Sequence, residues 1–191
     1  MLKREFILRA ATADDARSIA EVHVASWRTT YPGIIPTAFL DSLSVDKRTD
    51  QWRRNLNQLV RMHQTMVVTE RDQICGFISC GPARTEVAGS NSEVSSMYLL
   101  ASCQRIGLGR KLMAIAARRL ADSGFTHAHV WVAEANPATA FYERIGGRRV
   151  AQRVEPIAGI ELAEVALGFD DLATLAAPAQ PLPWVIGPGT A

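Results

Sequence analysis

Residues 104–113 read QRIGLGRKLM, and this stretch decides how the rest of the chain is interpreted. Gly107 and Gly109 stand where a helical pattern begins, with basic side chains around them. The first N–H groups of a helix have no partner inside it, and the helix dipole is positive at that end. Glycines also let a ligand approach the backbone closely. The stretch therefore predicts a loop that binds a phosphate-bearing molecule.

Two common phosphate motifs do not fit these residues. A Walker A loop requires Gly-Lys followed by Ser or Thr, whereas Gly109 is followed by Arg110 and Lys111. A dinucleotide fingerprint requires a third glycine where Leu112 stands. The pattern that does fit is Gln or Arg, two residues, Gly, any residue, Gly, which residues 104–109 match.

Length and composition limit the classes of protein to consider. A chain of 191 residues, 48% hydrophobic and 21% charged, fits one globular domain with a substantial core. The net charge of +2 does not indicate a nucleic-acid partner. The three cysteines form no CxxC pair, the first fifteen residues contain no apolar signal segment, and four prolines interrupt the apolar C-terminal stretch. We therefore expect a cytoplasmic protein without a membrane partner.

Outward from the loop, the spacing of apolar residues predicts a helix over residues 107–122. A strand at 93–100 precedes it and a strand at 127–133 follows it. A strand, helix and strand in this order form a βαβ unit, so the two strands should be parallel with a right-handed crossover.

The remaining elements extend this unit. The patterns predict further strands at 6–11, 65–70 and 74–80, a loop at 81–92 containing Glu86, two final strands joined near residues 156–159, and helices from 12 to 30, from 37 to 62 in two pieces, and from 137 to 145. This order predicts an α/β fold, a mixed sheet with helices on both faces. We expect one domain over residues 1–175 and an Ala/Pro/Gly-rich tail over 176–191.

Three blocks of sequence match one family. They are LRAATADDARSIAEVHVASWRTTYPGIIP (8–36), SMYLLASCQRIGLGRKLM (96–113) and VWVAEANPATAFYERIGG (130–147). On these blocks the chain resembles the GNAT superfamily of acyl-CoA-dependent N-acetyltransferases, over roughly residues 5–172. The resemblance implies a central mixed sheet of about six to seven strands with a splayed strand pair at the cofactor site. It also implies acetyl-CoA as co-substrate, no metal, and a homodimer, which is common in the family.

Three positions depart from the family's pattern. Arg105 stands where Gly is frequent, Ala101 where Pro is frequent, and Gly146-Gly147 where Gly-Phe is frequent. None of these changes removes a chemically reactive group, but the missing Phe alters the expected packing after the 137–145 helix.

The resemblance also implies which residues hold the cofactor. Backbone N–H groups of the loop would bind the pyrophosphate, and the strand before it, bulged and splayed from its neighbour, would pair with the pantetheine arm. The cofactor-binding residues implied in this way are Met97, Tyr98, Leu99, Gln104, Arg105, Ile106, Gly107, Leu108, Gly109, Arg110, Asn136 and Tyr142. Asn136 has a second reading, since Asn followed by Pro is also a common helix start.

Three residues carry catalytic roles by the same resemblance. The Leu99 N–H would stabilise the oxyanion, Tyr142 would protonate the coenzyme A thiolate, and Glu93 would act as general base, often through water. A phenol with a pKa of about 10 is a proton source at neutral pH. The alternatives without a catalytic role are that Tyr142 packs at the edge of the core and that Glu93 is a solvated residue at the end of a strand.

Histidines offer a different reading of the site. His127 and His129 point to one face of a strand, and His23 lies on a helix, but no third metal ligand stands nearby in the sequence. We therefore interpret these three histidines as structural.

The acceptor pocket is expected around Trp27, Tyr31 and Gly33, with the 37–62 region and the 81–92 loop. The main hypothesis is transfer of an acetyl group from acetyl-CoA to a primary amine, of a small molecule or of a protein or peptide, by direct attack. The alternatives are a non-catalytic acyl-CoA-binding module and a transferase for a longer acyl-CoA. The apolar residues 184–186 of the tail could dock on the domain or on a partner chain, or could stay disordered.

Overall fold

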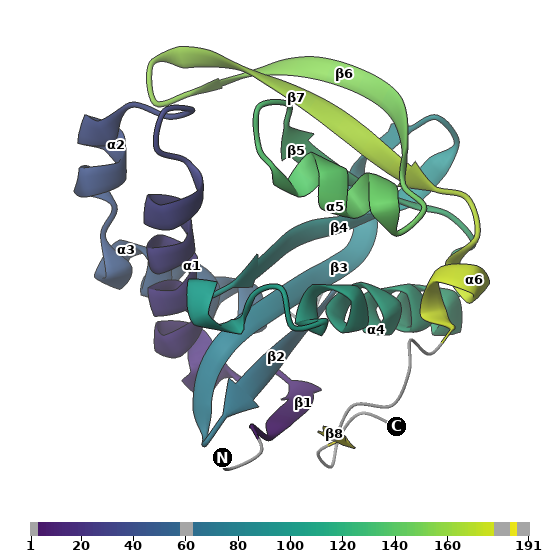
Figure 1. Ribbon diagram of the computed structural model, residues 1–191, viewed down its shortest axis with the longest axis horizontal. Coiled ribbons are helices and arrows are strands. Elements are labelled where there is room, and N and C mark those ends of the chain that lie inside the picture. Colours follow the sequence, from purple (N-terminus) through teal and green to yellow (C-terminus); the bar gives the residue numbers. More distant parts are fainter. Residues whose placement is uncertain (1–3, 58–62, 178–183, 187–191) are drawn as a thin grey trace.

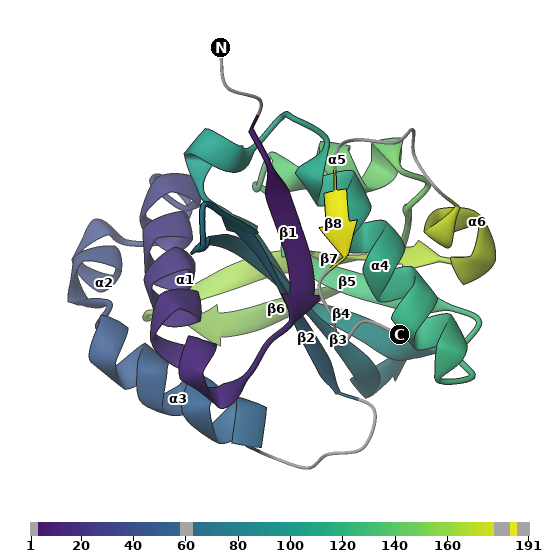
Figure 2. The same cartoon turned by 90° about the horizontal axis from the view of Figure 1, so that it is seen from below.

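The computed structural model describes residues 4–57, 63–177 and 184–186. They form an eight-stranded mixed sheet in the order β6-β7-β5-β4-β3-β2-β1-β8, with helices on both faces (Figures 1 and 2). The strands are β1 (Phe6–Ala10), β2 (Gln64–Glu70), β3 (Gln73–Val87), β4 (Ser90–Leu99), β5 (Ala128–Ala133), β6 (Arg148–Ile157), β7 (Ile160–Phe169) and β8 (Trp184–Ile186). The helices are α1 (Ala16–Thr30), α2 (Thr37–Ser42), α3 (Val45–Asn57), α4 (Leu108–Asp122), α5 (Ala138–Arg144) and α6 (Leu172–Ala176), with short 3₁₀ turns at Ala13–Asp15 and Ala101–Cys103.

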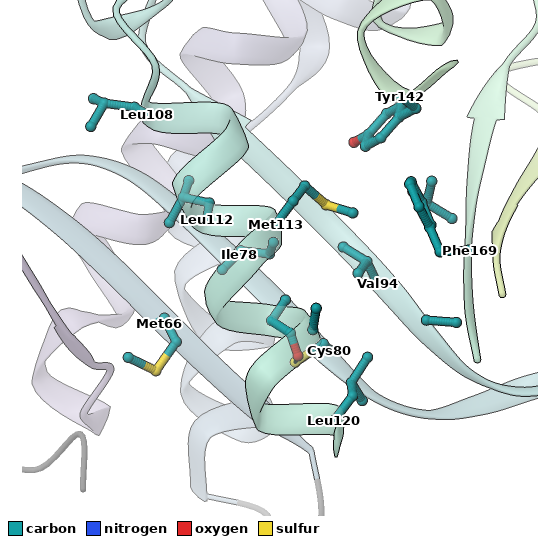
Figure 3. Close-up of a cluster of buried hydrophobic side chains, with 14 of the residues drawn as sticks. Met66, Ile78, Cys80, Val94, Leu108, Leu112, Met113, Leu120, Tyr142 and Phe169 are labelled. Carbon is teal, nitrogen blue, oxygen red and sulfur yellow. Dashed lines mark hydrogen bonds between the residues drawn. The ribbon is translucent and has the colours of Figure 1, made fainter. Parts of the chain in front are cut away.

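Alternation along the strands builds two cores, one on each face of the sheet. In β2, Met66 and Val68 point to one face while Val67 points to the other. The larger core packs the strands against α4, α5 and α6, and Figure 3 shows Tyr142 reaching into it from α5. The smaller core packs them against α1 and α3, with Trp52 and Phe77 at its centre. The predicted α/β fold with helices on both faces is confirmed.

The predicted βαβ unit is also confirmed. β4 and β5 are parallel neighbours, and α4 connects them. The apolar positions expected on one helix face, among them Leu108, Leu112 and Leu120, are fully buried against the sheet. The expected helix over 37–62 forms two pieces, α2 and α3, and its last residues, 58–62, lie outside the described residues.

The loop predicted at residues 81–92 is wrong. β3 continues to Val87 and β4 begins at Ser90, so the two strands form one long hairpin. Its tip is a two-residue turn in which Ala88 and Gly89 have φ values of 49° and 78°. The polar residues after Pro82 resemble a loop because the strand pairing is irregular there, with a register shift between Pro82 and Val87. Accordingly, Glu86 lies in β3, and Glu93 is the fourth residue of β4 rather than its first.

The C-terminal tail contributes the eighth strand. Residues 184–186 form β8, which runs parallel to β1 with Phe6 opposite Trp184 and Leu8 opposite Ile186. Of the alternatives left open by the sequence, the described residues therefore show docking on the domain itself. The division at residues 175 and 176 stays a prediction, although α6 spans it.

The described residues contain neither a membrane-spanning helix nor a metal-ligand cluster. No helix there is both long and apolar enough to cross a membrane. No group of three or more His, Cys, Asp or Glu side chains in those ranges could hold a metal ion.

Candidate active site

The central feature of the sheet is a gap between β4 and β5. Their pairing is a single register position, Glu93 opposite His129, after which the strands diverge. Figure 1 shows β5, β6 and β7 turned at an angle to β3 and β4. The fold therefore leaves one edge of β4 unpaired between two layers of helices.

A bulge in β4 accompanies this divergence. Opposite β3, Ser96 pairs with Ser79 and Val94 pairs with Cys80, so Ser95 has no counterpart. A bulge bends the strand that carries it and increases its twist, which moves the end of β4 away from β5. The bulged, splayed strand pair predicted by resemblance is present.

The backbone of Leu99 faces this gap. The N–H of Leu100 donates to the carbonyl of Cys75 on β3 at 2.9 Å. Successive residues of a strand direct their hydrogen-bonding groups to opposite edges, so the Leu99 N–H points away from β3 and into the gap. The Leu99 carbonyl, on the same edge, accepts a hydrogen bond from Nε2 of Gln104 at 2.9 Å. The side chain of Gln104 thus fixes the end of β4.

The loop before α4 presents free backbone donors at one end of the gap. Arg105 and Gly107 have φ values of 59° and 90°, and residues 104–107 are all exposed. Within the described ranges, the N–H groups of residues 105–110 donate to no backbone carbonyl; the first to do so is that of Lys111, to Gly107. Such a row of N–H groups at a helix start forms a concave site for an anion.

Helix α5 brings Tyr142 and Asn136 to the same region. A Cβ on Gly109 would lie 3.2 Å from the ring of Phe141, so the glycine allows α5 to pack against the loop. The Oδ1 of Asn136 accepts a hydrogen bond from the N–H of Ala138 at 2.9 Å, so this side chain satisfies the first N–H group of the helix, although the N-cap position itself is Pro137. Both Asn136 and Tyr142 are buried.

The ring of Tyr142 is buried, and its hydroxyl lies at the edge of the buried region. In the described part of the chain this hydroxyl has no hydrogen-bond partner. A fully buried polar atom without a partner would be unsatisfied, and among the described side chains the one such atom is Nε2 of His129, not the Tyr142 oxygen. The Tyr142 oxygen is therefore accessible. Burial, with a smaller contribution from Tyr31, raises the pKa of Tyr142 above its ordinary value. The phenol accordingly keeps its proton at neutral pH.

On the other face of the sheet, the buried carboxylate of Glu93 forms an ion pair with the exposed side chain of Arg84. Its Oε1 accepts from Nε of Arg84 at 2.6 Å, and its Oε2 lies 3.8 Å from Nε2 of His129. The Nδ1 of His129 lies 3.2 Å from the hydroxyl of Ser90. Burial lowers the pKa of His129, and the attraction of Glu93 offsets only part of this effect. The imidazole is thus neutral at pH 7, and the carboxylate is held by Arg84.

A family model described as the acetyltransferase (GNAT) family matches residues 23–147. The chain belongs to this family. It is 42% identical over 168 residues to the N-acetyltransferase YuaI of Bacillus subtilis, which covers 88% of this chain and 95% of the relative.

Solved structures agree with this fold. The PaiA N-acetyltransferase of Thermoplasma acidophilum, in complex with coenzyme A, has a TM-score of 0.63 at 20% identity, over 84% of this chain and 98% of that one. YncA of Salmonella typhimurium, with its cofactor acetyl-CoA, has a TM-score of 0.61 at 21% identity, over 92% of this chain and 97% of that one.

The acetyltransferase has a cleft of about 860 Å³ on the α1–α3 side of the sheet. Trp27, Glu93 and Tyr98 line it, together with residues of α3 and with Ile157 from the tip of the β6–β7 hairpin. Figure 1 shows this hairpin reaching over toward α1 and α2. The part of the cleft next to α1 and α3 lies on the opposite face of the sheet from the loop before α4, and the cleft extends further to Arg119 on α4.

An aromatic cluster forms the wall of this cleft. Nε1 of Trp27 donates to the hydroxyl of Tyr98 at 2.9 Å, and the rings of His23 and Tyr98 stack with centroids 4.7 Å apart. Tyr31 does not line the cleft, but its side chain interacts with those of Tyr98 and Asn136, which places it beside the gap. Gly33 is not among the lining residues.

Two residues of the candidate site, His129 and Arg48, are not assigned to it by the sequence. His129 comes beside Glu93 only because the register of a parallel strand pair sets them opposite each other. Arg48 lines the cleft from α3, where a helix with charges at many positions gives no sign of which one faces inward. The sequence did predict that the strands of Glu93 and His129 are parallel neighbours, and this pairing could have indicated that the two side chains lie close together.

Proposed function

We propose that this acetyltransferase transfers the acetyl group of acetyl-CoA to a primary amine by direct attack within a ternary complex. Coenzyme A would bind on the α4–α5 side and the amine in the cleft on the α1–α3 side. The bound coenzyme A of PaiA and acetyl-CoA of YncA support the choice of co-substrate. Direct attack of the amine on the thioester fits a site in which the cofactor side and the acceptor cleft meet at the β4–β5 gap.

On the cofactor side, the loop and the open edge of β4 act together. The backbone N–H groups of residues 105–110 bind the pyrophosphate, and Arg105 and Arg110 add positive charge. The backbone of residues 97–99 pairs with the pantetheine arm, which takes the place of a neighbouring strand. The Leu99 N–H then reaches the thioester oxygen and stabilises the charge that develops on it.

Bond making and proton transfer involve both faces of the sheet. An amine with a pKa of about 10.4 is mostly protonated at neutral pH, so a proton must leave before attack. Glu93 accepts that proton through a water molecule. The amine nitrogen bonds to the carbonyl carbon and releases its second proton to water, and the carbon–sulfur bond breaks as Tyr142 protonates the departing thiolate. Solvent then restores the proton of Tyr142.

The observation that carries this proposal is the direction of the Leu99 N–H, into a gap with Tyr142 on one face and Glu93 on the other. A calorimetric titration with acetyl-CoA, beside dephospho-coenzyme A, tests the cofactor half. A free-thiol assay over a panel of amines tests transfer. No binding at millimolar acetyl-CoA would overturn the proposal, and binding without thiol release for any amine would indicate a non-catalytic module. A series of acyl chain lengths tests preference for acetyl.

A cytoplasmic location and a homodimer remain predictions for this chain. Sedimentation over a range of concentrations, with the full chain and with a variant lacking residues 176–191, tests the dimer. A monomer mass at every concentration would refute it.

A further inference from the structure

The acceptor cleft carries an excess of positive charge. Of the described residues that line it, Arg48 and Arg84 bring positive charge and Glu93 is the one carboxylate, while a third arginine, Arg119, lines the cleft from α4. Arg84 already forms an ion pair with Glu93 at 2.6 Å. His23 adds no charge, because burial lowers its pKa to about 3. A cationic ligand entering this cleft would therefore meet mainly like charge.

Arg48 is the arginine nearest to the aromatic wall and has no acidic partner. Its guanidinium carbon lies 5.9 Å from the centroid of a Trp27 ring, and its Nη1 donates to Oε1 of Gln51 at 2.8 Å. Within the described ranges no carboxylate lies within ion-pair distance of Arg48, and the residues outside those ranges include no Asp or Glu. Its other donor groups are available to a ligand.

The surroundings of Arg48 favour an anionic partner. Burial lowers the pKa of Arg48, with a partial offset from Tyr98, so its charge is incompletely solvated. A partly buried cation without a counter-charge is unfavourable, and a bound anion relieves that cost. The planar guanidinium matches the two oxygens of a carboxylate or phosphate.

Arg48 is also placed to orient the acceptor. Its charge acts on Tyr98 and His23, and the backbone of Tyr98 leads directly to Leu99 at the gap. A small ligand held by Arg48 would thus lie along the aromatic wall, with its far end toward the reacting carbon.

We propose that the acceptor is a small primary amine that also carries an anionic oxygen group, and that Arg48 binds this group. The inference rests on the proposed acetyl transfer and specifies its substrate class. Amino acids and aminoalkyl phosphonates belong to this class. Polyamines do not, because they bring further positive charge to a cleft that already has an excess.

The test compares matched amines on the full-length protein. Thiol release is measured with amino acids, with their carboxamides, with the corresponding amines that lack the carboxyl group, with aminoalkyl phosphonates and with spermidine. We expect kcat/KM for the best anionic amine to exceed that of its uncharged counterpart by about 10- to 100-fold. Comparing kcat/KM for amino acids with kcat/KM for aminoalkyl phosphonates shows whether the site prefers a carboxylate or a phosphonate.

Arg48→Gln should remove this preference. The expected loss is about 10- to 100-fold in kcat/KM for anionic amines, mostly as a higher KM, with little change for amines lacking the anion. Arg48→Lys keeps the charge without the planar fork and should recover part of the loss. Arg54→Gln removes the same charge from the exposed side of α3 and serves as the matched control. Thermal unfolding and acetyl-CoA titration verify that each variant is folded and binds the cofactor.

Three results would overturn the inference. They are a preference for carboxamides or spermidine, an equal loss for all amines in Arg48→Gln, and acetyl-CoA binding without turnover of any anionic amine in the panel. Failure of acetyl-CoA to bind at all would instead refute the proposed function. The two failures are therefore distinguishable.

Discussion

Replacement of Tyr142 by Phe tests whether Tyr142 donates a proton to the leaving thiolate, as the proposed mechanism requires. The substitution removes one oxygen and keeps the buried ring in the core that Figure 3 shows. Because the hydroxyl has no hydrogen-bond partner among the described residues, its removal leaves no buried group unsatisfied. We therefore expect a folded protein with nearly wild-type thermal stability and acetyl-CoA affinity.

The size of the kinetic effect follows from the leaving group. General acid catalysis contributes about 10²- to 10⁴-fold to a rate. A thiol with a pKa of about 8.5 leaves readily as its anion, so the lower end applies. We expect kcat to fall about 100-fold, which corresponds to about 2.7 kcal/mol in the activation free energy. The raised pKa of Tyr142 keeps the phenol protonated, so the ratio of wild-type to variant kcat should stay constant over about pH 7 to 9.

Thiol release under saturating acetyl-CoA and amine measures this effect. Tyr31→Phe provides a contrast, since it removes a hydroxyl beside the gap that has no part in the proposed proton transfer and should lower kcat far less than Tyr142→Phe. A fall in kcat of less than about threefold in Tyr142→Phe, with chemistry shown to be rate-limiting, would refute the assignment of Tyr142 as general acid.

Three further substitutions test the framework of the site. Gly107→Ala places a side chain at φ 90°, so we expect about 1–2 kcal/mol lower stability in denaturant unfolding and weaker acetyl-CoA binding by calorimetry; unchanged values for both would contradict the loop geometry. Leu112→Ala leaves a cavity in the larger core and should cost about 2–5 kcal/mol of unfolding free energy, whereas a cost below about 1 kcal/mol would contradict its full burial. Arg9 lowers the pKa of Asp15, so the stabilisation exists above the ordinary value of 3.8 and disappears as pH falls through the lower folded value. The loss of stability caused by Asp15→Asn should therefore be largest at neutral pH and should disappear as the pH falls below 3.8. A loss of stability that does not depend on pH would refute the ion pair as its cause.

The sequence predicts the parts of the site that depend on local spacing. Leu108, Leu112 and Leu120 define one helix face by themselves, and glycines at 107 and 109 mark its start, so the central βαβ unit and the loop follow directly. The capping role of Asn136 is equally local, since it involves the N–H two residues later.

The parts that sequence cannot predict depend on register between distant strands. Whether Glu93 is solvated or buried is decided by its position opposite His129, which lies on another strand. The length of the β3–β4 hairpin depends on pairing that tolerates Pro82 and a register shift, and its polar composition alone resembles a loop. The inward direction of Arg48 likewise depends on how α3 docks against Trp27 from α1.

The irregularity of the sheet is what makes its chemistry feasible. If β4 and β5 were paired along their whole length, the Leu99 N–H would be consumed in the ladder and the two faces of the sheet would be sealed from each other. The bulge at Ser95 and the single Glu93–His129 pairing prevent this. In the proposed mechanism, a thioester carbon in the gap would have the leaving sulfur on the side of Tyr142 and the incoming nitrogen on the side of Glu93. Acid and base can therefore act on the same carbon without competing for the same space, which a direct transfer requires.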